Sequence, residues 1–136
     1  MTETDDIIQT LGRLIMRSAR DSPAGWDYAG YVFSIAKDEA VRVEPFLFSG
    51  GQRGSIDHIP VRHEVANAFL RLREVTRVPG DDRWKAMLMV LRRDGGKLKF
   101  LFEFDNADRW EITPQNADES YRILVGEVFP GAVSGS

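Results

Sequence analysis

The chain has no cysteine among its 136 residues. This absence excludes disulfide bonds, thiolate nucleophiles, and zinc or iron–sulfur sites built from cysteine. It fits a reducing compartment, and we expect a cytoplasmic location. Without such cross-links the fold depends on its own core, and a hydrophobic content of 43% is enough apolar material for one domain of this length.

Long apolar runs are also absent. A membrane-spanning helix needs about 20 consecutive apolar residues, whereas Arg13, Arg17 and Arg92 interrupt the best candidate segments. The first ten residues are MTETDDIIQT, which is acidic where a secretory signal begins with basic residues. We therefore expect neither a membrane-spanning segment nor export by that route.

The motifs of common catalytic and metal sites are missing as well. Of the two histidines, His58 and His63, the second is followed by Asn67 where a zinc-binding His-Glu-x-x-His helix needs another histidine. There is no Gly-x-Ser-x-Gly nucleophile segment, and the glycine-rich segment 50–54 lacks the lysine and serine of a phosphate-binding loop. Residues 105–108 are too few for a calcium-binding EF-hand loop. The sequence predicts no catalytic residue, no metal and no cofactor.

Charge of one sign is not in large excess, since the formal net charge is only −3. This charge weakly repels nucleic acid. A local basic patch could overcome the repulsion, and the candidates are Arg71, Arg73, Arg77, Arg92, Arg93 and Lys97. We interpret them as an ordinary solvated surface because acidic residues lie among them, so a nucleic-acid partner is not expected.

The residues that are present show clear periodicities. Apolar residues recur at helical spacing over 5–21 and again from Pro60 to Pro79, and a third helix is expected after Pro114. Aromatic and β-branched residues at 26–36 and 41–48 indicate a hairpin, and a buried strand at 84–91 followed by Gly95 and Gly96 indicates another. The prediction is an α+β fold in which an antiparallel sheet of four to five strands, from two hairpins, is covered by three helices.

We expect one domain over residues 1–130, with a frayed C-terminal tail at 131–136. The segment 49–55 contains three glycines and no apolar residue, which predicts a mobile surface loop between elements. In the last strand Phe100, Phe102 and Phe104 lie on one face and Lys99, Leu101, Glu103 and Asp105 on the other, and we expect the phenylalanine face to belong to the core.

Carboxylates occupy the opposite face of that strand. Glu103 and Asp105 are two residues apart, which would place them about 7 Å from each other on one face. Such a pair could do acid–base chemistry or bind a cation. A solvated strand face has the same alternating pattern, and we favour that interpretation of the pair.

Three segments together resemble the YezG-like family of bacterial immunity proteins: 26–48 and 84–92, each led by a tryptophan, and 96–105, GKLKFLFEFD. The resemblance covers most of the chain and rests on core and turn residues. Phe104 stands where the family commonly has tyrosine, and the glycine-rich loop is longer. The resemblance implies an amphipathic first helix, a Trp-led strand, a helix, a second Trp-led strand and a glycine turn into the last strand.

The function implied by the resemblance is that of a cytoplasmic antitoxin, which binds and blocks a cognate toxin, often a nuclease. Inhibition by occlusion needs no catalytic residue, and an acidic domain can present carboxylates to a basic nuclease surface. We place the expected interface on Glu103, Asp105 and Asp108, with Trp110 as an aromatic anchor.

Two alternatives remain open at this point. One is an enzyme for a small ligand or with a metal, in which Glu103, Asp105 and a histidine converge in a concave site. The other is a self-associating module, in which exposed Trp110 and Phe129 pack in a homodimer.

Overall fold

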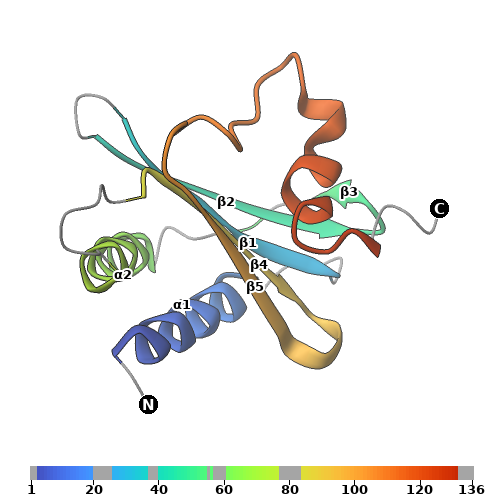
Figure 1. Ribbon diagram of the computed structural model, residues 1–136. Coiled ribbons are helices and arrows are strands. Elements are labelled where there is room, and N and C mark those ends of the chain that lie inside the picture. Colours follow the sequence, from blue (N-terminus) through green and yellow to red (C-terminus); the bar gives the residue numbers. More distant parts are fainter. Residues whose placement is uncertain are drawn as a thin grey trace.

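The computed structural model describes residues 3–19, 26–36, 40–54, 56, 61–76 and 84–131 (Figure 1). The helices are α1 (Glu3–Ala19) and α2 (Arg62–Val75), with short helical turns η2 (Asp94–Gly96), η3 (Ala117–Glu119) and η4 (Arg122–Gly126). The strands are β1 (Tyr28–Ile35), β2 (Val41–Ser49), β3 (Gln52–Arg53), β4 (Ala86–Arg92) and β5 (Lys97–Glu103). They form one open antiparallel sheet in the order β3-β2-β1-β4-β5, which confirms the predicted α+β fold.

The sheet separates two layers (Figure 1). Helices α1 and α2 cover one face, and the C-terminal segment 104–131 covers the other. Strand β4 is buried on both faces from Ala86 to Leu91, as its continuous apolar sequence predicts. No helix in the described ranges is long and apolar enough to cross a membrane.

Aromatic stacking organises the core beneath the two helices. Phe33 of β1 stacks on Phe69 of α2, with ring centroids 4.7 Å apart, and Trp84 stacks on Phe102 at 5.1 Å. The indole Nε1 of Trp84 donates a hydrogen bond to the hydroxyl of Thr76, at the end of α2, at 3.0 Å. The buried indole N–H is therefore satisfied. These contacts join α2, β1 and β5 into one packed layer.

The second core lies between the sheet and the C-terminal segment. Its buried members include Val32, Phe46, Phe48, Leu88 and Val90 from the sheet and Trp110, Leu124, Val125, Val128 and Phe129 from the segment. The predicted third helix is present, but as the 3₁₀ turn η3 and the π-helical turn η4 instead of a regular α-helix. Of the expected frayed tail, only Gly131 is among the described residues.

The prediction of a mobile loop at 49–55 is wrong for the residues described there. Strand β2 continues to Ser49, and β3 pairs with it through a two-residue turn at Gly50 and Gly51. Their φ angles are 59° and 82°, which the tight hairpin turn requires and glycine adopts without strain. The Asp27 carboxylate accepts a hydrogen bond from the Gly50 N–H at 2.7 Å and fixes the turn to the start of β1.

The expected phenylalanine core face is also wrong in two of its three members. Phe102 packs beside Trp84, but Phe100 is 36% exposed and Phe104 is 49% exposed. Strand β5 is the outermost strand, so its side chains have neighbours on one side only. The strand ends at Glu103, so Phe104 no longer follows the alternation.

Candidate functional site

The basic residues considered above do not form one patch. Arg71 pairs with Glu3 at 2.7 Å, and Arg73 donates to the Trp84 carbonyl at 2.7 Å, just before β4 begins. Arg92 and Arg93 lie at the other end of β4, about 20 Å away by strand rise, and Arg77 is outside the described residues. The candidate patch is therefore split between opposite ends of the sheet.

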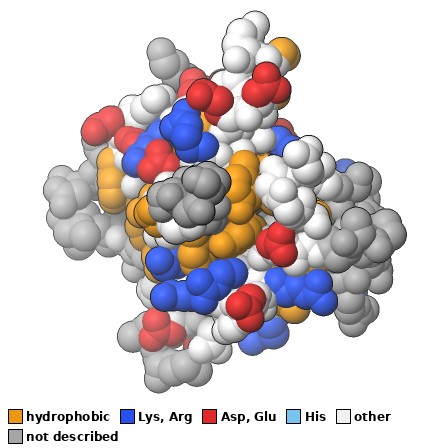
Figure 2. Space-filling model, turned by 90° about the vertical axis from the view of Figure 1, so that its right-hand side faces the viewer, with side chains coloured by type: hydrophobic (Ala, Val, Ile, Leu, Met, Phe, Trp, Pro, Cys, Tyr) orange, Lys and Arg blue, Asp and Glu red, His pale blue; other side chains and the backbone are white. Residues whose placement is uncertain are grey.

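Cations do gather around the tip of the β4–β5 hairpin. Figure 2 shows Lys and Arg side chains in the lower half of the face turned to the viewer, beneath a hydrophobic area. Arg92 of β4 and Lys99 of β5 lie 5.6 Å and 4.8 Å from the centre of the Phe129 ring. Such contacts hold the aliphatic stems against an aromatic face and leave the charges hydrated.

Glu103 is the last residue of β5, and the other predicted site residues lie just beyond it, in a segment of turns that crosses the sheet. Hydrogen bonds within the segment fix its path: Asp108 N–H donates to the Asn106 side chain at 3.0 Å, and Glu111 N–H donates to the Asp108 carbonyl at 3.1 Å. Asp105 and Asp108 are exposed on this segment. The turn is thus a defined support for two solvated carboxylates.

Glu103 has a structural role at the start of the turn. Its carboxylate accepts hydrogen bonds from the N–H groups of Asp105 at 2.8 Å and Asn106 at 3.1 Å, and from Arg109 at 3.2 Å. The two backbone donors, followed by Arg109, hold the pKa of Glu103 below its usual range. The prediction that Glu103 and Asp105 share a strand face is wrong, because the chain turns after Glu103 and brings the Asp105 amide back to its carboxylate.

Trp110 is buried, with 1% of its surface exposed. It packs in the core above the sheet, and the Arg109 guanidinium lies 4.8 Å from its ring centre. Arg109 also reaches Glu103 at 3.2 Å and Glu127 at 3.6 Å. The expectation of Trp110 and Phe129 as exposed surface residues is therefore wrong, since Phe129 is buried too. Trp110 supports from beneath the turn at residues 105–108, which carries Asp105 and Asp108 and which we call the acidic turn.

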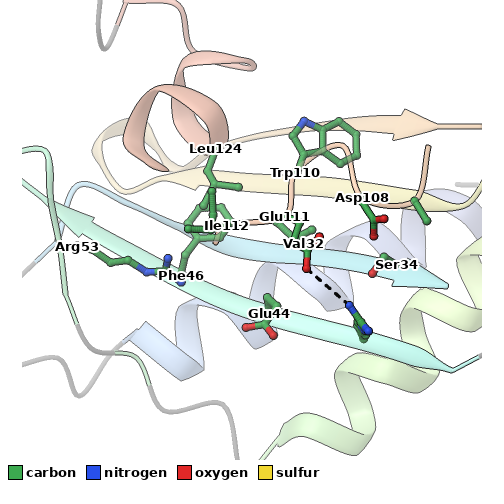
Figure 3. A pocket seen from close by; sticks show the side chains of 12 residues that line it. Val32, Ser34, Glu44, Phe46, Arg53, Asp108, Trp110, Glu111, Ile112 and Leu124 are labelled. Carbon is green, nitrogen blue, oxygen red and sulfur yellow. Dashed lines mark ion pairs between the residues drawn. The ribbon is translucent and has the colours of Figure 1, made fainter. Parts of the chain in front are cut away.

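Two adjoining concavities lie between this segment and the sheet. The smaller has a volume of about 150 Å³ (Figure 3), and the larger, of about 700 Å³, continues toward the start of β4. Both are lined by Ser34, Arg42, Ala107, Asp108 and Glu111. We call the two together the acidic-turn groove.

The acidic-turn groove carries charges of both signs. Asp105, Asp108 and Glu111 come from the turn segment, whereas Arg42 comes from β2, Lys85 lies just before β4 and Arg73 comes from α2. Arg42 and Glu111 approach to 3.8 Å across it, as the dashed line in Figure 3 shows. Sequence reasoning did not bring these three cations together: it named Arg73 only as a candidate for a basic patch, and it did not single out Arg42 or Lys85 as site residues. The alternation of β2 places Arg42 and Glu44 on the same face as Phe46, which was the available signal.

The groove does not assemble a catalytic constellation from the described residues. Glu103 is held ionised by three donors, which suits an acceptor and not a general acid. His63 is exposed on α2, on the far face of the sheet, and His58 is outside the described residues. Among the residues that the structure describes, no three His, Cys, Asp or Glu side chains lie close enough to hold a metal ion.

Comparisons with known proteins add no family: no family model matches the chain, and no curated protein matches its sequence. The resemblance to the YezG-like family remains a prediction from the residues that carry it.

Proposed function

We propose that this chain is a non-catalytic binding protein that blocks a protein partner by occlusion. Following the resemblance to YezG-like immunity proteins, the partner is a cognate bacterial toxin, and the chain acts as its antitoxin. The observation that carries the proposal is the acidic turn: Asp105 and Asp108 are exposed on a segment that Glu103 and Arg109 hold in place.

A preformed turn reduces the entropic cost of binding, because less of the segment has to be ordered on contact. The exposed carboxylates of the turn accelerate encounter with a basic surface and fix the orientation of the complex. Asp105 and Asp108 are the contacting residues in this proposal. Glu103 and Trp110 act by positioning the turn, since both are engaged within the molecule.

The mixed charge of the acidic-turn groove supports a protein partner over a nucleic acid. A phosphate backbone is recognised by a surface of predominantly positive charge. The acidic-turn groove is instead lined in part by Asp105, Asp108 and Glu111. Interfaces between proteins commonly have polar, charged rims of both signs.

The proposal is tested with a tagged chain used to capture partners from its native cells. The test variant is Asp105→Asn with Asp108→Asn. The matched control is Asp6→Asn with Glu64→Gln, which also removes two carboxylates, from the helices on the opposite face of the sheet. We expect the unmodified chain and the control to capture the same protein in equal amounts, and the test variant to lose most of it.

The captured protein is then expressed alone and together with the chain. An immunity protein must restore the growth of cells that the partner would otherwise kill, and the Asp105/Asp108 variant must restore it less well. Capture that is equal for both variants would remove the acidic turn from the interface. Failure of the chain to protect cells from any captured partner would remove the antitoxin function itself.

A further inference from the structure

The outer edge of β5 is the long open edge of the sheet (Figure 1). The hydrogen bonds from Ile35 N–H to the Lys85 carbonyl and from Arg93 N–H to the Asp27 carbonyl show that odd-numbered residues of β4 face β1. Even-numbered residues of β4 therefore face β5, where they pair with odd-numbered residues. The backbone N–H and C=O groups of Leu98, Phe100 and Phe102 consequently point away from the sheet, and no described strand pairs with them.

The opposite edge of the sheet is protected in two ways. Strand β3 covers the end of β2 at Phe48 and Ser49. The Leu47 carbonyl accepts from Gly54 N–H on this outer side, so Pro45, two residues earlier, also faces outward, where a further strand would need an N–H donor. Strand β5 has no proline, and it is seven residues long with a 36% exposed phenylalanine at its centre. A long open edge with an exposed apolar side chain is a site at which another strand can pair.

The sequence of β5 is complementary to itself when two copies run antiparallel about Phe100. Phe100 then faces Phe100 of the second copy, and Leu98 of each copy faces Phe102 of the other, which makes three pairs. These three pairs lie on the face covered by α1 and α2, and each exchanges two backbone hydrogen bonds. The aromatic and aliphatic side chains form a continuous cross-strand ladder.

The opposite face of the same pairing is complementary in charge. Lys97 of each copy lies opposite Glu103 of the other, at both ends of the paired strands. The Glu103 carboxylate accepts three hydrogen bonds within its own chain, and a carboxylate has about four acceptor sites. One site thus remains for Lys97. Opposite charges in direct cross-strand pairs stabilise a sheet, and this register places no like charges opposite each other.

We infer that the chain forms a two-fold symmetric dimer in which the β5 strands of two copies pair antiparallel about Phe100 and join their sheets into one. The dimer uses the edge of β5, and not the buried Trp110 and Phe129. Asp105 and Asp108 line a groove together with Ser34 of β1 and Arg42 of β2, on the side of β4 away from the β5 edge, so the strand pairing does not use these two carboxylates. The inference is therefore independent of the proposed antitoxin function, and either can fail without the other.

The first test compares the mass of the unmodified chain with that of two glutamate variants by sedimentation over a wide range of concentration. We expect the unmodified chain to reach twice the 15.4 kDa of one chain. Phe100→Glu places two carboxylates opposite each other at the symmetry axis, and we expect it to remain at 15.4 kDa. Phe104→Glu makes the same change at a more exposed phenylalanine outside the strand, and we expect it to dimerise.

The second test places no charged side chain at position 100. The chain has no cysteine, so Phe100→Cys introduces a single thiol. In a hydrogen-bonded antiparallel pair the Cα atoms are about 5.5 Å apart, within the range that a disulfide spans. We expect rapid oxidation of this variant to a covalent dimer, and much slower cross-linking of Phe104→Cys. An unmodified chain that stays monomeric at every concentration would overturn the inference, as would equal cross-linking of the two cysteine variants.

Discussion

Replacement of Gly30 by alanine adds a single methyl group, and the structure predicts a large loss of stability from it. Gly30 lies in the central strand β1, between Phe46 of β2 and Val90 of β4. A Cβ atom there would overlap the Met89 carbonyl oxygen and lie 2.9 Å from Cζ of Phe46. Neither neighbour can withdraw easily, because Met89 contributes backbone and Phe46 is fully packed.

The expected cost follows from what must move. Overpacking of a core costs about 1–3 kcal/mol. Displacement of β4 weakens neighbouring ladder hydrogen bonds, each of which contributes about 0.5–1.5 kcal/mol. We expect Gly30→Ala to lower the free energy of unfolding by about 3–5 kcal/mol, a large part of the 5–15 kcal/mol typical of a domain.

Gly12 provides the matched control. It lies inside α1, where the one atom of the described residues that a Cβ atom would meet outside the helix is Cδ2 of Leu98, at the ordinary contact distance of 3.5 Å. Alanine at a helix interior is favoured over glycine by about 0.5–1 kcal/mol. Gly12→Ala should therefore stabilise the protein while Gly30→Ala destabilises it, and denaturant titration with a common slope m measures both. If Gly30→Ala cost less than about 1 kcal/mol, the close packing of β1 against β4 would be refuted.

Two further predictions concern the support of the acidic turn. The pKa of Glu103 is lowered in the folded protein, so its stabilising effect is present above the usual glutamate value of 4.5 and is lost as the pH falls through the lowered pKa. Below about pH 4.5 the free energy of unfolding should thus decline less steeply for Glu103→Gln than for the unmodified chain, and parallel acid titrations would contradict this. Trp110 Nε1 is buried without a hydrogen-bond partner among the described residues, so Trp110→Phe removes an unsatisfied donor together with some volume. We expect Trp110→Phe to change the free energy of unfolding by no more than about 1 kcal/mol, and Trp110→Ala to lower it by about 3–5 kcal/mol. Equal losses for the two variants would show that the indole nitrogen is satisfied.

Stability and the proposed interactions should be separable in this molecule, because they are assigned to different residues. Asp105, Asp108 and Phe100 are exposed, so their replacement should affect association and leave the fold intact. Glu103, Arg109 and Trp110 hold the turn segment on the sheet. A loss of partner binding in variants of the second group would have to be separated from a loss of turn structure.

The sequence by itself determined α1, α2 and the two hairpins, but not β3 or the pairing of β1 with β4 that joins the hairpins. Periodic apolar residues defined α1 and α2, the apolar run of β4 defined a strand buried on both faces, and Gly95 with Gly96 marked the hairpin into β5. These features are local: helical or strand periodicity and the tolerance of glycine for positive φ act within a few residues. An antiparallel sheet between layers of helices follows from them.

Only the tertiary structure decided which side chains are covered. Phe100 and Phe102 have the same place in the alternation of β5, yet one is exposed and the other packs on Trp84. Trp110, predicted as a surface anchor, fills the core because the C-terminal segment folds back over the sheet. Alternation shows which face of a strand a side chain occupies, but burial depends on what lies above that face, and those neighbours come from distant parts of the chain.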